Sequence, residues 1–158
     1  MKNLFSIIPF IFSLNLIANS NISQIPIESY MAQEKKSDSV EVSVDRLFYV
    51  NSRCSALFIY VASMTMNPTS EKEKTVNANA MTGAQMFNLN ATNYWMLKTG
   101  KDDFDRANTH AFSVIQRMVA TYEGDGKNYY ADTGNHLSGY IKSDMQICSL
   151  IGKEMSKN

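Results

Sequence analysis

The stretch LFYVNSRCSALFIYVASMTM, residues 47–66, carries an apolar side chain at every third or fourth position. This stripe consists of Leu47, Val50, Cys54, Leu57, Val61 and Met64. Because an α-helix turns once in 3.6 residues, the spacing places all six side chains on one face. Phe48, Ile59 and Ala62 widen the apolar surface, so we expect this helix to contact more than one neighbour.

Helix-start and helix-stop signals flank this stretch. Ser43 is a suitable N-cap for the first helix, and Asn67-Pro68 ends it, because proline cannot continue the preceding turn. Ser70 opens a second helix, since Ser70-Glu-Lys-Glu73 matches the capping box, in which serine and glutamate satisfy each other's backbone donors. This helix is predicted to run to Thr99, with Gly100 just beyond its end.

Two more helices are predicted in the C-terminal half. The third begins near Asp102, and its apolar stripe comprises Phe104, Ala107, Ala111, Val114 or Ile115, Met118 and Tyr122. Gly124-Asp125-Gly126 is predicted to end it and to open a loop over residues 127–134. The fourth begins between Asp132 and Asn135, and its stripe comprises Leu137, Ile141, Met145, Cys148, Ile151 and Met155.

Four amphipathic helices predict an all-α fold, an antiparallel four-helix bundle with up-down-up-down topology, over a single domain of residues 43–158. The two cysteines, Cys54 and Cys148, lie on the first and fourth helices. Those helices are antiparallel neighbours in such a bundle, and the cysteines then lie at similar heights. We therefore expect a Cys54–Cys148 disulfide; two buried free thiols are the alternative.

The first 20 residues read as a secretory signal peptide. Met1-Lys2-Asn3 is a short basic start, an apolar run follows, and Ala18-Asn19-Ser20 offers small residues for cleavage after Ser20, with Ser23 as the second choice. An uncleaved membrane anchor is the alternative, although the run is short and contains Pro9. The sequence thus predicts export to the periplasm or the extracellular space, where disulfides persist.

Residues 21–42 show no clear period and are expected to form a poorly ordered N-terminal arm. Ile25, Ile27, Tyr30 and Met31 could dock parts of this arm on the bundle. The whole chain has 15 basic and 15 acidic residues. A near-neutral chain gives no electrostatic reason to expect nucleic acid as a partner, and no second apolar stretch is long enough to span a membrane.

Candidate binding residues are few. A recognition surface could be supplied by Tyr49, Tyr60, Trp95, Tyr129 and Tyr130. Tyr129 and Tyr130, in the expected loop, are the preferred candidates, because loops on a rigid scaffold often carry function. The alternative, without a binding role, is that both rings pack over the end of the bundle and cap it. Arg106, His110 and Arg117 share one strip of the third helix and form a weaker candidate anion site. A solvated histidine on a basic face is the alternative interpretation of that strip.

The residues carry no recognisable catalytic motif, and no cofactor is predicted. The leading hypothesis is a non-enzymatic exported protein that binds an unknown protein or small ligand. The alternative is a haem- or metal-binding bundle that uses His110 or His136 with core methionines. Methionines on core faces more often fill gaps than ligate metals.

Overall fold

The computed structural model describes residues 25–34 and 40–157, so the expected signal peptide lies outside the described residues. The described residues form helices and no strand. In chain order the helices are α1 (Ile27–Glu34), α2 (Val40–Met64), α3 (Glu71–Thr99), α4 (Phe104–Thr133) and α5 (Gly139–Met155). The all-α fold is therefore confirmed. None of these helices is long and apolar enough to cross a membrane.

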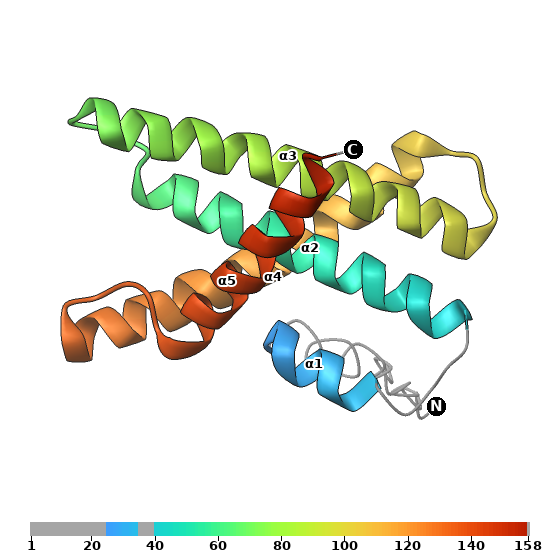
Figure 1. Cartoon of the computed structure of the whole chain (residues 1–158), viewed down its shortest axis with the longest axis horizontal. Coiled ribbons are helices and arrows are strands. Elements are labelled where there is room, and N and C mark those ends of the chain that lie inside the picture. Colours follow the sequence, from blue (N-terminus) through green and yellow to red (C-terminus); the bar gives the residue numbers. More distant parts are fainter. Residues whose placement is uncertain (1–24, 35–39, 158) are drawn as a thin grey trace, which may run out of the picture.

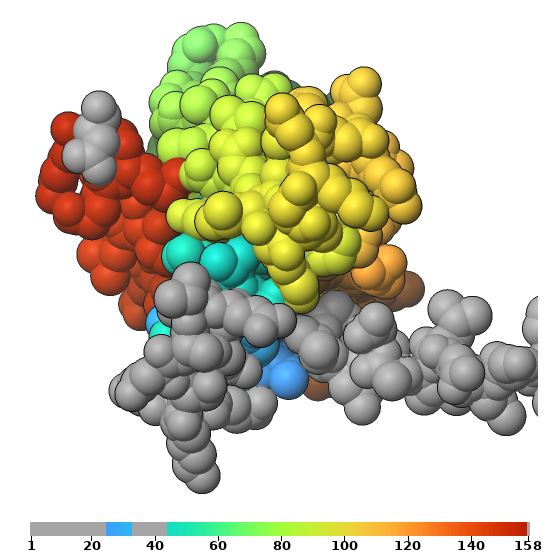
Figure 2. All heavy atoms as spheres, turned by 90° about the vertical axis from the view of Figure 1, so that its right-hand side faces the viewer, coloured from blue at the N-terminus to red at the C-terminus, as the bar shows by residue number. Residues whose placement is uncertain are grey.

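Helix α2 lies at the centre and contacts each of the other four helices. Figure 1 shows α3 running alongside α2, with α4 packed against both. In the space-filling view, little of α2 is visible between α3, α4 and α5 (Figure 2). All nine residues over 49–57 are buried. The expectation that this helix contacts several neighbours is thus confirmed. Its middle part is buried on every side, whereas Leu47 and Met64, at the two ends of the predicted stripe, are exposed.

The second predicted helix has the predicted boundaries. The Glu73 backbone N–H donates to the Ser70 hydroxyl, and the Ser70 N–H donates to the Glu73 carboxylate, each over 3.2 Å. At the other end Gly100 adopts a left-handed conformation with φ of 62°, which glycine adopts without a steric penalty. The capping box and the glycine stop are therefore confirmed.

The predicted end of the third helix at Gly124-Asp125-Gly126 is wrong, because α4 continues through both glycines to Thr133. An added Cβ at Gly126 would overlap the Tyr60 hydroxyl and lie 2.8 Å from the Tyr60 Cζ. Gly126 therefore allows α4 to approach α2 closely. The helix ends instead at Gly134, which has φ of 70°.

The fourth predicted helix begins later than expected. Asn135 does not cap it; its side chain accepts a hydrogen bond from the Leu137 N–H over 2.8 Å, which forms a local turn. Helix α5 begins at Gly139. The predicted loop over 127–134 is consequently wrong, and the connection between α4 and α5 covers residues 134–138.

The predicted disulfide is confirmed. Cys54 in α2 and Cys148 in α5 are fully buried and bonded, with 5.4 Å between their Cα atoms. The regular up-down-up-down arrangement is not confirmed. Figure 1 shows α5 crossing the middle of α2, and α1 adds a short helix within the expected arm. Ile27 of α1 is buried and Tyr30 and Met31 pack against the core, as their predicted docking requires.

A buried ion pair lies beside the disulfide and was not predicted. Arg53 Nε lies 2.7 Å from Asp144 Oδ2, and both side chains are fully buried. Asp144 also accepts hydrogen bonds from the Tyr122 hydroxyl over 2.6 Å and from the Ile27 backbone N–H over 2.9 Å. This cluster, the Asp144 hub, joins α1, α2, α4 and α5 through one carboxylate.

Replacing Asp144 with asparagine should lower the free energy of unfolding by about 3–5 kcal/mol, because Arg53 then keeps its charge in a buried site without a counter-charge. Urea unfolding followed by circular dichroism measures this loss. Asp132→Asn, at an exposed position of α4, is the matched control and should change stability by about 0.5 kcal/mol or less. Equal midpoints for the two variants would contradict the role of the hub.

The two glycines inside α4 should respond in opposite directions to alanine. Gly124 is exposed and an added Cβ meets nothing within 4 Å, so Gly124→Ala should stabilise the protein by about 0.5–1 kcal/mol through helix propensity. Gly126→Ala should destabilise it by about 1–3 kcal/mol, because the methyl group overlaps Tyr60. Thermal unfolding of both variants tests this. A neutral Gly126→Ala would show that α4 does not approach Tyr60 in this way.

Candidate functional site

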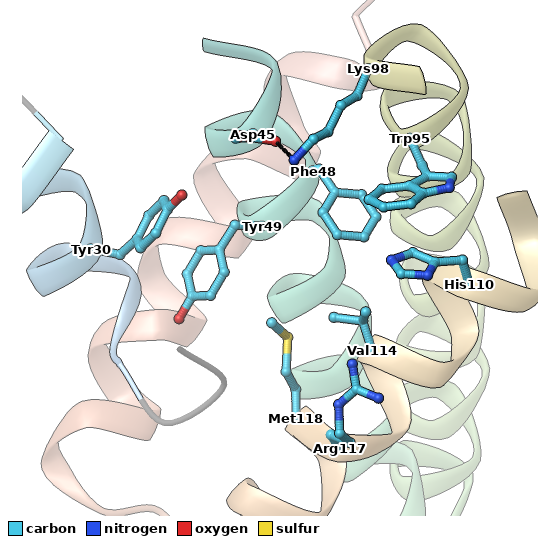
Figure 3. A pocket seen from close by; sticks show the side chains of 10 residues that line it. All are labelled: Tyr30, Asp45, Phe48, Tyr49, Trp95, Lys98, His110, Val114, Arg117 and Met118. Carbon is cyan, nitrogen blue, oxygen red and sulfur yellow. Dashed lines mark ion pairs between the residues drawn. The ribbon is translucent and has the colours of Figure 1, made fainter. Parts of the chain in front are cut away.

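A pocket of about 330 Å³ lies between α1, the first half of α2, the end of α3 and the first half of α4 (Figure 3). We call it the aromatic pocket. Its lining consists of Tyr30, Asp45, Phe48, Tyr49, Trp95, Lys98, His110, Val114, Arg117 and Met118. Its volume falls within the range of sites that hold small organic ligands.

Three ring systems from three helices form one wall of the aromatic pocket. The His110 imidazole of α4 stacks on the indole of Trp95 in α3, with 3.6 Å between centroids and 15° between planes. Phe48 of α2 lies 5.3 Å from Trp95 and 5.9 Å from His110, centroid to centroid. Because these rings pack on one another, each limits the freedom of its neighbours. The positions of the three rings are therefore fixed by their contacts with one another.

Two tyrosines lie on the other side of the pocket (Figure 3). Tyr30 of α1 stacks on Tyr49 of α2 with 3.9 Å between centroids. Tyr49 is connected to the Asp144 hub, because Arg53 Nη1 donates a hydrogen bond to its hydroxyl over 3.4 Å. Burial raises the pKa of Tyr49 to about 12, so its hydroxyl stays protonated and donates to the Ile25 carbonyl. These contacts fix the second wall.

Charged groups lie at the rim of the pocket. Lys98 Nζ lies 2.5 Å from Asp45 Oδ1, and Figure 3 shows the lysine reaching across to that carboxylate. Arg117 lies lower, beside Val114. Burial lowers the pKa of His110 from its usual 6.5, and the positive charges of Arg117 and Lys98 lower it further. His110 is therefore neutral at pH 7, and a planar ligand could stack in the pocket beside a positive group.

The structure brings only two of the three residues of the predicted anion strip to one pocket. His110 and Arg117 both line the aromatic pocket. Arg106 lies outside it, in shallow hollows next to Asp103, one of which His110 also borders. His110 is partly exposed and its ring stacks on Trp95 of α3, and a solvated histidine stays the alternative interpretation. The strip thus identified two of the ten lining residues.

The predicted tyrosine surface lies elsewhere. Tyr129 and Tyr130 belong to the last turns of α4 and not to a loop. Tyr130 is about half exposed and stacks on His136 with 4.2 Å between centroids. It borders a second hollow, which also contains Tyr60, Glu123 and Lys127. Whether this surface binds a partner stays a prediction.

The two histidines line separate hollows. Met118 shares the aromatic pocket with His110, and Met64 shares the second hollow with His136, so the haem or metal alternative stays a prediction for either histidine. Among the residues that the structure describes, no three histidine, cysteine, aspartate or glutamate side chains are grouped as a metal site would require.

The sequence indicated Tyr49 and Trp95 as possible recognition residues, but it did not indicate Phe48, and it gave Tyr30 only a docking role. Phe48 looked like part of a wide apolar face, and Trp95 lies next to the stripe residue Tyr94. One signal was present: Trp95 and Lys98, three residues apart on one helix face, precede the glycine stop. An aromatic and a cationic residue at a helix end mark a possible binding position.

The chain matches no protein-family model, no curated protein sequence and no solved structure.

The stacked pair gives a direct optical test of the site. Trp95 is the single tryptophan of the chain, and a protonated imidazole quenches indole emission more strongly than a neutral one. Emission should therefore fall as the pH is lowered, with a midpoint below 6.5. His110→Gln should remove this transition, whereas His136→Gln, in the other hollow, should keep it. A transition that survives His110→Gln would contradict the stacked geometry.

Proposed function

We propose that this protein is a non-enzymatic binding protein that holds a small planar aromatic ligand in the aromatic pocket. The observation that carries the proposal is the pair of aromatic walls, Phe48, Trp95 and His110 on one side and Tyr30 with Tyr49 on the other. A flat ring that enters between them gains both apolar contact and stacking.

The rigidity of the walls supports this proposal. Each wall is stacked within itself, and Tyr49 is tied to the buried Arg53. A pocket that is formed in advance does not spend binding free energy on ordering its side chains.

Export remains part of the proposal. A disulfide between Cys54 and Cys148 is compatible with an oxidising compartment. The apolar first segment of the sequence has the order of charged, apolar and small residues that signal peptides show. A binding protein in that compartment would meet ligands from outside the cytoplasm.

The test uses the dye 1-anilinonaphthalene-8-sulfonate and the emission of Trp95. Bound dye should quench Trp95 and gain emission by energy transfer, because the indole lines the pocket. Phe48→Ala should weaken dye binding by about tenfold, the effect of about 1.4 kcal/mol of lost ring contact. Tyr130→Ala, in the other hollow, is the control and should leave the affinity unchanged.

Circular dichroism of each variant would verify that the helices are intact. The proposal fails if the dye does not quench Trp95 in the folded protein, or if Tyr130→Ala and not Phe48→Ala weakens binding. The second result would favour the hollow around Tyr130 and His136.

A further inference from the structure

The charges around the aromatic pocket are unequal. Lys98 and Asp45 form an ion pair at the rim, so their charges compensate each other. Arg117 forms no ion pair with any carboxylate whose side chain the structure describes. With His110 neutral at pH 7, the lining carries one net positive charge.

The helix that carries Arg117 does not supply a counter-charge to it. Side chains three and four positions away on a helix are neighbours, and these positions hold Ser113, Val114, Ala120 and Thr121. All four lack a carboxylate. Arg117 is itself exposed, so it is accessible to a ligand. A cation beside an aromatic hollow, without a counter-charge on its own helix, attracts an anion supplied from outside.

Resting on the proposed function, we propose that the ligand of the aromatic pocket is a monoanion, a planar aromatic compound with one carboxylate or sulfonate group that is held by Arg117. Guanidinium groups bind such oxyanions through two parallel hydrogen bonds. The rings of the ligand then lie between the aromatic walls, and its charge compensates the one net positive charge of the lining.

Asp45 limits the charge that the pocket accepts. The Asp45 carboxylate forms an ion pair with Lys98, so Arg117 is the cation of the lining that is left to bind the ligand. A second anionic group on the ligand would lie near Asp45 at the rim, and the two negative charges would repel each other. Removing the Asp45 charge should therefore strengthen anion binding, whereas removing the Arg117 charge should weaken it. These opposite effects distinguish charge selection from a general loss of structure.

The experiment compares two dyes with the same rings. 1-Anilinonaphthalene-8-sulfonate carries one negative charge, and N-phenyl-1-naphthylamine lacks the sulfonate and is neutral. The readout is the ratio of their dissociation constants, measured through quenching of Trp95. Arg117→Gln should reduce the preference for the anionic dye by about tenfold or more, the effect of the lost charged hydrogen bonds to the sulfonate, and should change the affinity for the neutral dye much less.

Asp45→Asn provides the second variant and should increase the preference for the anionic dye several-fold, since it releases Lys98. Lys127→Gln, a cation of the other hollow, is the matched control and should change neither dye. If both dyes bind and neither Arg117→Gln nor Asp45→Asn changes the ratio, the selection of an anion is overturned while the aromatic site stands. If neither dye quenches Trp95, both this inference and the proposed function are overturned.

Discussion

The buried ion pair between Arg53 and Asp144 is the interaction around which α1, α2, α4 and α5 meet. Removing two charges from water is costly, and only close pairing and further hydrogen bonds make such a pair tolerable. Asp144 meets this demand with three donors, the Arg53 guanidinium, the Tyr122 hydroxyl and the Ile27 backbone N–H. Since burial raises the pKa of Tyr122 well above its usual value of 10, the phenol keeps the proton that it donates. The need to satisfy one carboxylate therefore fixes where four helices meet.

The aromatic pocket depends on the same hub. Arg53 reaches Tyr49 with a second nitrogen, and Tyr49 supports Tyr30 by stacking. Helix α1 is anchored at its first residue by Asp144, which places Tyr30 against α2. The opposite wall depends instead on α3 and α4, whose contact brings Trp95 and His110 together. The hub thus holds one wall of the pocket, and the contact between α3 and α4 holds the other.

Local patterns predicted the parts of the fold that are local in origin. The capping box at Ser70, the central helix and the disulfide all follow from spacing along the chain. Gly126 misled the prediction because its reason lies across the interface, at Tyr60. The pocket walls come from four helices, and no single helix reveals them. Asp144 could have been noticed, since it lies on the apolar stripe of the last helix, where an unpaired carboxylate is costly.

Hydrogen exchange at the Ile27 amide tests the hub most directly. Ile27 is the first residue of α1, and the first four N–H groups of a helix have no acceptor within it. Protection of this amide therefore requires the Asp144 carboxylate. The account predicts slow exchange at Ile27 and fast exchange at the exposed Glu28 and Ser29 in the same turn, with the protection lost in Asp144→Asn. Exchange at Ile27 as fast as at Glu28 and Ser29 would contradict it.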